Sequence, residues 1–239
     1  PSSITSIGAV AFCNCTLLRK IEIPNSVTSI GKYTFYGCSM LQEINIPTSV
    51  TFIGSNAFEK CSSLEEIIIP SSVTSIGDMA FKKCTSLQKI TIPSSIFEIG
   101  KFTFCDCTCL EQIYFESPCN MTYIGEGAFC RCSELTEISI PYSIKSIEER
   151  TFEKCVSLEK IVIPSSVISI GFEAFIGCLA LDQISFPPFL ENIANRAFYE
   201  CISLKKIIIP KYVTSIGNGA FSKCSSLKQM SLPSFVDSK

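Results

Sequence analysis

The sequence predicts a repeat solenoid, in which successive coils of the chain stack into a rod and contribute parallel strands to it. A column of cysteines recurs every 23 residues, with one step of 25 residues between Cys107 and Cys132. Phenylalanine and leucine recur at the same interval, beginning with Phe12 and Leu18. Ten copies of one unit with this spacing predict ten similar coils. The column comprises Cys15, Cys38, Cys61, Cys84, Cys107, Cys132, Cys155, Cys178, Cys201 and Cys224.

Each unit reads LxxIxIPxSVxSIGxxAFxxCxx, as in residues 64–86, and its segments predict different local structures. In LxxIxIP the isoleucines are two residues apart, which is typical of a strand with one buried face, and the proline ends the strand because it lacks an amide donor. The VxSIG segment brings two further apolar residues inward, and the glycine of its SIG part suits a turn or a close contact between coils. Glu148 and Ala194 replace that glycine, so positive φ is not a strict requirement there. AFxxC is too short for a stable helix and predicts a single helical or 3₁₀-like turn.

Stacking follows from the size of the unit, since the apolar side chains of one coil do not offset the entropy lost in ordering 23 residues. Stacked coils share their apolar faces, and we expect their strands to join into one parallel sheet with about 4.8 Å between neighbours. We expect residues 1–239 to form a single solenoid of about ten 23-residue coils, cut within a repeat at both ends. Uncapped ends would expose apolar edges and allow oligomers to form.

Composition and motifs argue against catalysis, nucleic-acid binding and membrane insertion. The formal charge is -2, with acids and bases scattered along the chain, so no basic stripe fits a phosphate backbone. No apolar run approaches the ~20 residues that span a bilayer, and the first residues lack the features of a signal peptide. Histidine is absent, so a serine or cysteine nucleophile lacks its usual base. A glycine-rich phosphate loop is absent too. We predict a non-enzyme without catalytic residues, cofactor or metal, and a protein as its partner.

Two positions in each strand, on either side of its first isoleucine, are expected to face solvent and form a binding surface. The first position carries a mixed-charge row, and the second alternates between polar and apolar residues from Asn45 onward. One interpretation is a contact stripe centred on Tyr114, because aromatic residues ringed by polar groups concentrate binding energy. The alternative is that β-branched and aromatic residues simply favour strands. The candidate binding residues are Glu66, Ile68, Lys89, Thr91, Gln112, Tyr114, Glu137, Ser139, Lys160 and Val162.

The cysteine column is interpreted as buried thiols, because free cysteine packs as a small apolar residue and the column shows no alternation that would pair its members. Five cysteines lie outside it: Cys13, Cys105, Cys109, Cys119 and Cys130. Cys105 and Cys130 follow the phenylalanine in adjacent coils, at a position that we expect to be exposed. A disulfide between them, free thiols and a metal site are the alternatives, and zinc is disfavoured because histidine and CxxC spacings are absent.

Asn14 and Asn120 each begin an N-glycosylation sequon. Asn120 lies in the coil with the two extra residues, where we expect a protruding loop, whereas Asn14 precedes a cysteine that we expect to be buried. A serine also recurs two residues after most of the prolines, and local hydrogen bonding in turns explains it.

The motif LxxIxIPxSVxSIGxxAFxxC resembles the BspA-like subclass of leucine-rich repeats, and the resemblance covers the entire chain. It implies a right-handed superhelix with a concave parallel β-sheet and with short turns or 3₁₀ segments on the convex side. It also implies surface proteins of bacteria or parasitic protists, of which some mediate adhesion or bind host proteins, and no conserved active site. We therefore expect a cysteine-rich protein-binding module at the cell surface or outside the cell, with a host or matrix protein as partner. The alternatives are a cytoplasmic scaffold or regulatory protein and a structural spacer.

Overall fold

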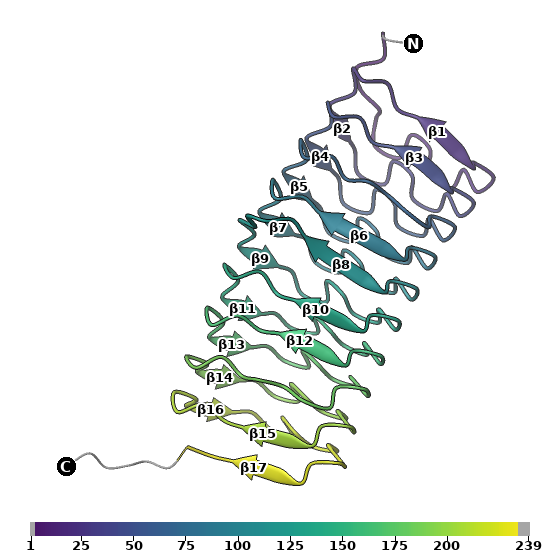
Figure 1. Cartoon of the computed structure of the whole chain (residues 1–239). Coiled ribbons are helices and arrows are strands. Elements are labelled where there is room, and N and C mark those ends of the chain that lie inside the picture. The colour runs from purple at the N-terminus through teal and green to yellow at the C-terminus, as the bar shows by residue number, and fades with distance from the viewer. Residues whose placement is uncertain (1–2, 234–239) are drawn as a thin grey trace.

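The chain is a parallel-strand solenoid of about nine turns, shown as a computed structural model in Figure 1. The coils are stacked in sequence order along a gently bent rod, with β1 near one end and β17 at the other. The structure describes residues 3–233, and this part of the chain contains turns and strands but no α- or 3₁₀-helix. It accordingly offers no helix that is long and apolar enough to cross a membrane. The expected short turns are confirmed, and within residues 3–233 the AFxxC segments form turns and not a helix or 3₁₀-helix.

The LxxIxIP segments form one row of strands, which we call the strand face. Strands of neighbouring coils pair in parallel, so that Lys20 is the partner of Glu43 and Lys89 that of Gln112. The expectation of one continuous sheet is wrong, because the row consists of four strand pairs, two of which are extended by single bridges at Glu66 and Gln183. One break, between β8 and β10, follows the coil with the two extra residues. The strands are β1 (Lys20–Glu22), β3 (Glu43–Asn45), β6 (Lys89–Ile92), β8 (Gln112–Phe115), β10 (Glu137–Ser139), β12 (Lys160–Val162), β15 (Lys206–Ile208) and β17 (Gln229–Ser231).

The SIG segments form a second row of strands that the sequence pattern did not predict. Each strand has two residues, too few to show an alternation of apolar and polar side chains, and the row divides into sheets of five and four strands. Most of its isoleucines, such as Ile30 and Ile53, are buried as expected, whereas Ile216 in the last strand of the row is 40% exposed. The strands are β2 (Ser29–Ile30), β4 (Phe52–Ile53), β5 (Ser75–Ile76), β7 (Glu98–Ile99), β9 (Tyr123–Ile124), β11 (Ser146–Ile147), β13 (Ser169–Ile170), β14 (Asn192–Ile193) and β16 (Ser215–Ile216).

The core lies between the two strand rows and the turns, and phenylalanines form its centre. Rings of successive coils stack with centroid distances from 4.9 Å, for Phe175 and Phe198, to 5.7 Å, for Phe104 and Phe129. The phenylalanines from Phe35 to Phe198 in this column have no exposed surface. Leucine, isoleucine, valine and cysteine columns surround them. Equivalent side chains therefore form files along the rod, as the 23-residue interval predicts.

In the AFxxC turns, each coil bonds to the next through its backbone. In one coil the amides of Tyr33, Phe35 and Gly37 donate to carbonyl oxygens of the following coil at 2.8–3.0 Å, and the amides between them bond within the turn. Tyr33 and Gly37 have positive φ, and the equivalent positions of other coils also have it, mostly with non-glycine residues. The bonds between coils satisfy backbone groups that a helix would pair internally, which explains why no helix forms.

The glycine of the SIG segment allows close packing of the coils. It does not adopt positive φ in the structure, so a turn requirement is not its role. A Cβ atom on Gly54 would lie 2.7 Å from backbone atoms of Gly31 and Lys32 in the preceding coil, and one on Gly171 would lie 2.7 Å from those of Glu148. Of the two roles that the sequence left open, the close contact between coils is the one that the structure shows.

Candidate protein-binding face

The ten candidate residues lie along the strand face, where the isoleucines alternate with them. In β12, Ile161 is buried while Lys160 and Val162 on either side are exposed. Nine of the ten are exposed, and Gln112 is half-buried. The register aligns them in two columns, because Thr91 pairs with Tyr114 and Ser139 with Val162. The fold therefore collects residues from five coils on one accessible surface.

Large apolar side chains recur in the second column of this face. Ile68 is 73% exposed, Tyr114 52%, Val162 61% and Ile208 57%. The Tyr114 hydroxyl donates a hydrogen bond of 2.9 Å to Oε1 of Gln112 in the same strand. This bond restrains the phenol group while leaving half of the residue open to solvent. A stripe of this kind, rimmed by polar residues, is typical of surfaces that contact other proteins.

The charges of the strand face differ between its two ends. A shallow hollow of about 1110 Å³ near the N-terminus is lined by Glu22, Glu43, Glu65 and Glu66, with Lys20 as its cation. A second hollow of about 660 Å³, near the C-terminus, is lined by Lys205, Lys206 and Ile208 without an acidic residue. The first column alone reads as mixed charge, so the sequence did not reveal this polarity. The difference in charge between the two ends becomes visible in the sequence when the first column is taken together with the residue before it in each coil, such as Glu65 and Lys205.

The cysteine column lies on the opposite side of the coil, near the turns. From Cys38 to Cys224, each column thiol donates a hydrogen bond of 3.1–3.2 Å to the phenylalanine carbonyl of the preceding coil. Burial raises the pKa of Cys38 to about 11 and that of Cys155 to about 12. Such thiols stay protonated at neutral pH, and since the thiolate is the reactive form, they are poor nucleophiles and poor metal ligands. The thiols are structural.

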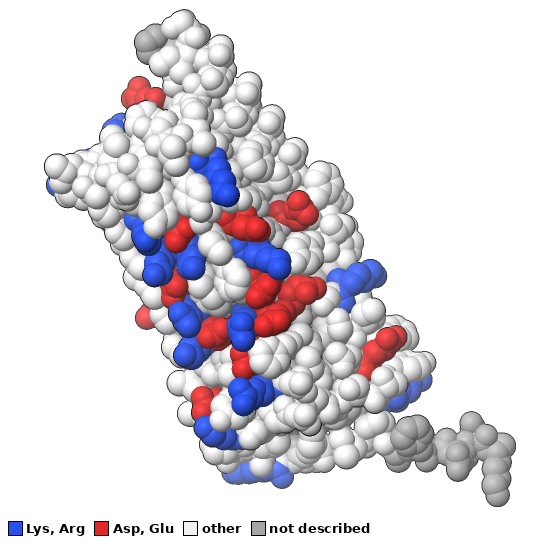
Figure 2. Space-filling model, turned by 180° about the vertical axis from the view of Figure 1, so that it is seen from behind, with Lys and Arg blue, Asp and Glu red and all other residues white. Residues whose placement is uncertain are grey.

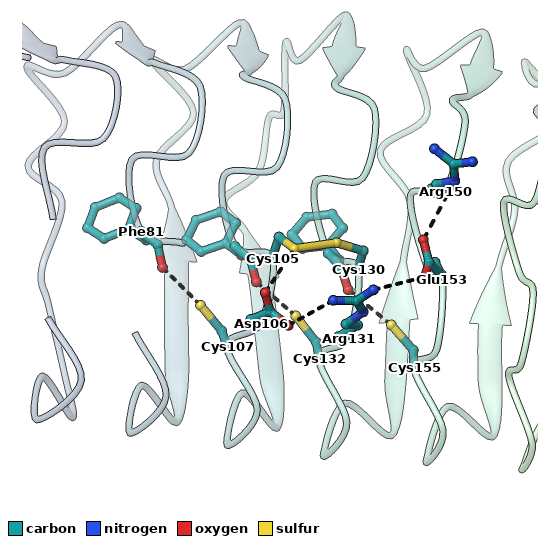
Figure 3. Close-up of a disulfide and its surroundings, with 12 residues drawn as sticks. Phe81, Cys105, Asp106, Cys107, Cys130, Arg131, Cys132, Arg150, Glu153 and Cys155 are labelled. Atoms are coloured by element: carbon teal, nitrogen blue, oxygen red, sulfur yellow. Dashed lines mark hydrogen bonds and ion pairs between the residues drawn. A yellow bond between two sulfur atoms is a disulfide. The ribbon is translucent and has the colours of Figure 1, made fainter. Parts of the chain in front are cut away.

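The additional cysteines Cys105 and Cys130 are joined by a disulfide, with their Cα atoms 4.7 Å apart. The expectation that their position is exposed is wrong, because only 4% of Cys105 and 3% of Cys130 is exposed. Two acidic residues lie beside the bond: Asp106 directly follows Cys105 in its coil, and Glu153 belongs to the coil after that of Cys130 (Figure 3). Arg131 extends over this region, with nitrogen atoms 3.6 Å from carboxylate oxygens of both acids. The disulfide thus clamps two coils beneath an ion-pair network.

That network continues along the side of the rod that the AFxxC segments form, which we call the turn side. There it makes a ladder of alternating charge. Arg150 lies 3.0 Å from Glu173 and 3.3 Å from Glu149, and Arg196 lies 3.4 Å from the same Glu173. The hydrogen bond with Glu173 is the main reason that the pKa of Arg150 is raised. Figure 2, the view from behind, shows basic and acidic side chains interleaved along the rod. These charges neutralise one another along the rod. On the strand face, ion pairs such as Lys20–Glu43 also occur, but acidic residues predominate near one end and lysines near the other.

The two sequons lie on the surface. Asn120 is exposed, and the Thr122 hydroxyl donates to the Phe97 carbonyl oxygen at 3.2 Å. Asn14 is exposed too, but the expectation of a buried cysteine beside it is wrong, because Cys15 is exposed. Within residues 3–233, no preceding coil covers Cys15 as one covers each later member of the column.

The recurring serines bond between coils instead of locally. The Ser49 hydroxyl donates to the Val27 carbonyl oxygen and that of Ser72 to Val50, each at 2.6 Å across 22 residues. Serine at this position therefore adds a link between neighbouring coils, a role that the local sequence could not reveal.

Comparison with known proteins identifies the family. A family model described as "BspA type Leucine rich repeat region (6 copies)" matches residues 1–110, 51–175 and 145–238. The leucine-rich repeat protein of T. pallidum is 31% identical, with 76% of this chain and 75% of that chain covered and a TM-score of 0.55. A leucine rich cell surface protein from Faecalibacterium prausnitzii A2-165 is 27% identical, with 95% and 83% covered and a TM-score of 0.54. No curated protein matches the sequence. The chain belongs to the family of BspA-type leucine-rich repeat proteins.

Proposed function

We propose that this chain is a non-catalytic protein-binding module of a microbial surface protein and that it holds its partner on the strand face. The observation that carries the proposal is the stripe of exposed Ile68, Tyr114, Val162 and Ile208. The polar groups on the turn side are largely occupied by bonds between coils, whereas these side chains have apolar surface left to bury. At about 4.8 Å per coil, members of the stripe recur about every 10 Å, a spacing that suits an extended partner surface.

A location at the cell surface or outside the cell is supported by three observations. One similar structure is that of a protein described as a cell surface protein. The Cys105–Cys130 disulfide suits an oxidising compartment, and the exposed Asn120 is open to glycosylation. The buried thiols do not favour the cytoplasm, because their shielding keeps them unreactive in any compartment. Adhesion to a host or matrix protein is the specific role that we propose.

Substitutions confined to the strand face test the binding surface. We expect the wild-type chain to bind at least one protein in a panel of immobilised extracellular matrix proteins, and Tyr114→Asp with Val162→Asp to weaken that binding at least about tenfold, because hot-spot side chains contribute about 2 kcal/mol or more. The matched control is Phe97→Asp with Ile168→Asp, which are 51% and 42% exposed away from this face. Equal loss in both double variants, or in neither, would argue against the strand face.

A separate experiment tests the proposed location at the cell surface or outside the cell. Antibody labelling and protease treatment of intact cells of the source organism should detect the chain outside the cell. Mass spectrometry of the peptide that contains Asn120 should show a glycan if the protein passes through a glycosylating secretory pathway. A chain that is protected on intact cells and released by lysis would support the cytoplasmic scaffold. Face variants without effect on any binding, in a chain that is exposed on cells, would support the spacer.

A further inference from the structure

The strand face carries opposite charges at equivalent positions of two distant coils. With the unit of Lys20 counted as the first, the third coil presents Glu65 and Glu66, and the ninth presents Lys205 and Lys206 at the same strand positions. All four side chains are exposed. Within residues 3–233, Lys205 pairs with Asp182 at 3.0 Å, while the other three form no ion pair. Both ends of the face therefore retain charge for a partner.

The rest of the face repeats this symmetry about the sixth coil, which holds Ser139. One coil away on either side lie Tyr114 and Val162, and two coils away lie the hydroxyl residues Thr91 and Ser185. Three coils away lie Ile68 and Ile208. A two-fold rotation about an axis along the sixth strand would reverse the order of the coils and keep each residue's position along its strand. Under that rotation every residue of one copy meets its counterpart in a second copy, as isologous interfaces require.

We propose that the strand face binds a second copy of this chain, face to face and with reversed coil order, about a two-fold axis at Ser139; this rests on the proposed function, in which the strand face is the binding surface. Glu66 of each copy then meets Lys206 of the other, Gln112 meets Lys160, and the four exposed apolar residues bury one another in two pairs. Sheets that pack face to face lie about 10 Å apart, a distance that these side chains span.

The size of the contact is sufficient for reversible association. Nine overlapping coils at about 4.8 Å, each with an extended segment of about 15 Å, give roughly 600 Å² per copy and roughly 1,200 Å² in total. This area lies at the lower end of the range of buried areas found in stable interfaces. The dimer should therefore dissociate within an accessible range of protein concentration. Three like-charge contacts weaken it, since Glu137 meets itself at the axis and Glu111 of each copy meets Glu159 of the other. We therefore expect Glu137→Gln to tighten the dimer.

Charge exchange tests both the contact and its direction. Sedimentation equilibrium of the 239-residue chain, at about 5 to 500 µM, should show a dimer that weakens as salt screens the charges. Glu66→Lys and Lys206→Glu should each raise the dissociation constant at least about tenfold, and the chain with both changes should recover to within about threefold of wild type. Loss in the single variants followed by recovery in the double variant requires reversed coil order. With equal order each position would meet its own copy, so like charges would face one another in wild type and in every variant, and the single changes would cause no loss. A double variant no tighter than the single variants would overturn the proposal.

Cross-linking locates the axis independently. In a background with the exposed Cys15 and Cys109 changed to serine, Ser139→Cys should be linked into a dimer by a thiol-specific reagent that spans about 10 Å, because this position meets itself across two sheets about that distance apart. Ser185→Cys is the matched control, an exposed serine of the same column, and it should remain monomeric because it faces Thr91 of the second copy. Equal cross-linking of both variants, or of neither, would contradict the axis.

The outcomes separate this inference from the proposed function. A wild-type chain that is monomeric at about 500 µM overturns the second copy as partner. If Tyr114→Asp with Val162→Asp still abolishes binding to an immobilised matrix protein, the strand face remains a binding surface for another protein. If the chain is monomeric and these variants bind like wild type, both proposals fail.

Discussion

The turn side and the strand face of the same coils differ in how their side chains are used. On the turn side, stacked phenylalanines, thiol hydrogen bonds and ion pairs such as Arg150–Glu173 tie each coil to the next. On the strand face, side chains such as Tyr114 and Val162 point to solvent, and the ties between coils are mainly backbone hydrogen bonds. The difference separates two tasks, because contacts between neighbouring repeats stabilise a solenoid whereas exposed side chains bind partners. Changes on the two sides should therefore have different effects.

The largest effect is expected in the phenylalanine column. Phe129→Ala should lower the free energy of unfolding by about 3 to 5 kcal/mol, since it leaves a cavity between two stacked rings. Urea denaturation followed by circular dichroism measures it. Phe97→Ala is the matched control, because Phe97 is 51% exposed and should cost well below half as much. A similar cost at both positions would show that the column is not the main stabilising element.

The disulfide should contribute the next largest effect. Replacing Cys105 and Cys130 with alanine should lower the free energy of unfolding by about 2 to 4 kcal/mol, because the bond closes a loop in the unfolded chain. Replacement of the exposed Cys109 is the control and should change little. Thiol titration of the denatured protein should give 13 free thiols without reductant and 15 with it. A count of 15 in both conditions would disprove the bond.

Alkaline pH should weaken the turn side through the thiol column. Burial raises the pKa of Cys155 to about 12 from an ordinary value of 9.0, so its contribution is intact below pH 9.0 and is lost as the pH rises toward about 12. Each such thiol makes the unfolding free energy fall by about 1.4 kcal/mol per pH unit in this window. Cys155→Ala should reduce the slope between pH 9.5 and about 11 by that amount. An unchanged slope would mean that Cys155 ionises equally in both states.

The smallest effect on stability is expected on the strand face. Tyr114→Ala and Val162→Ala should each change the free energy of unfolding by about 0.5 kcal/mol or less, because both side chains are more than half exposed. The same urea measurement tests this, with Phe129→Ala as the positive control. A loss above about 2 kcal/mol would show that these side chains hold the fold together, and the separation of tasks between the two sides would then be wrong.

The candidate site followed from the sequence because a strand alternates its side chains. Glu66 to Val162 could be placed on one face from the spacing of the isoleucines alone, and the structure places all ten candidates there. The second strand row could not be predicted, because two residues per coil carry no recognisable period. The prediction that Cys105 is exposed was wrong for a related reason. Residues of adjacent coils, about 4.8 Å away, shield this side chain from solvent, and the pattern within one unit does not contain them.

The sequence by itself determined the repeat, the family and the columns of equivalent side chains, because a fixed 23-residue interval allows each unit to bury its apolar residues only against its neighbours. The tertiary structure decided which bonds link the coils: the thiols and serines donate to carbonyl groups of the preceding coil, and the glycines provide close approach instead of a turn. These properties depend on contacts between residues 22 or more positions apart, which the pattern within one unit does not specify.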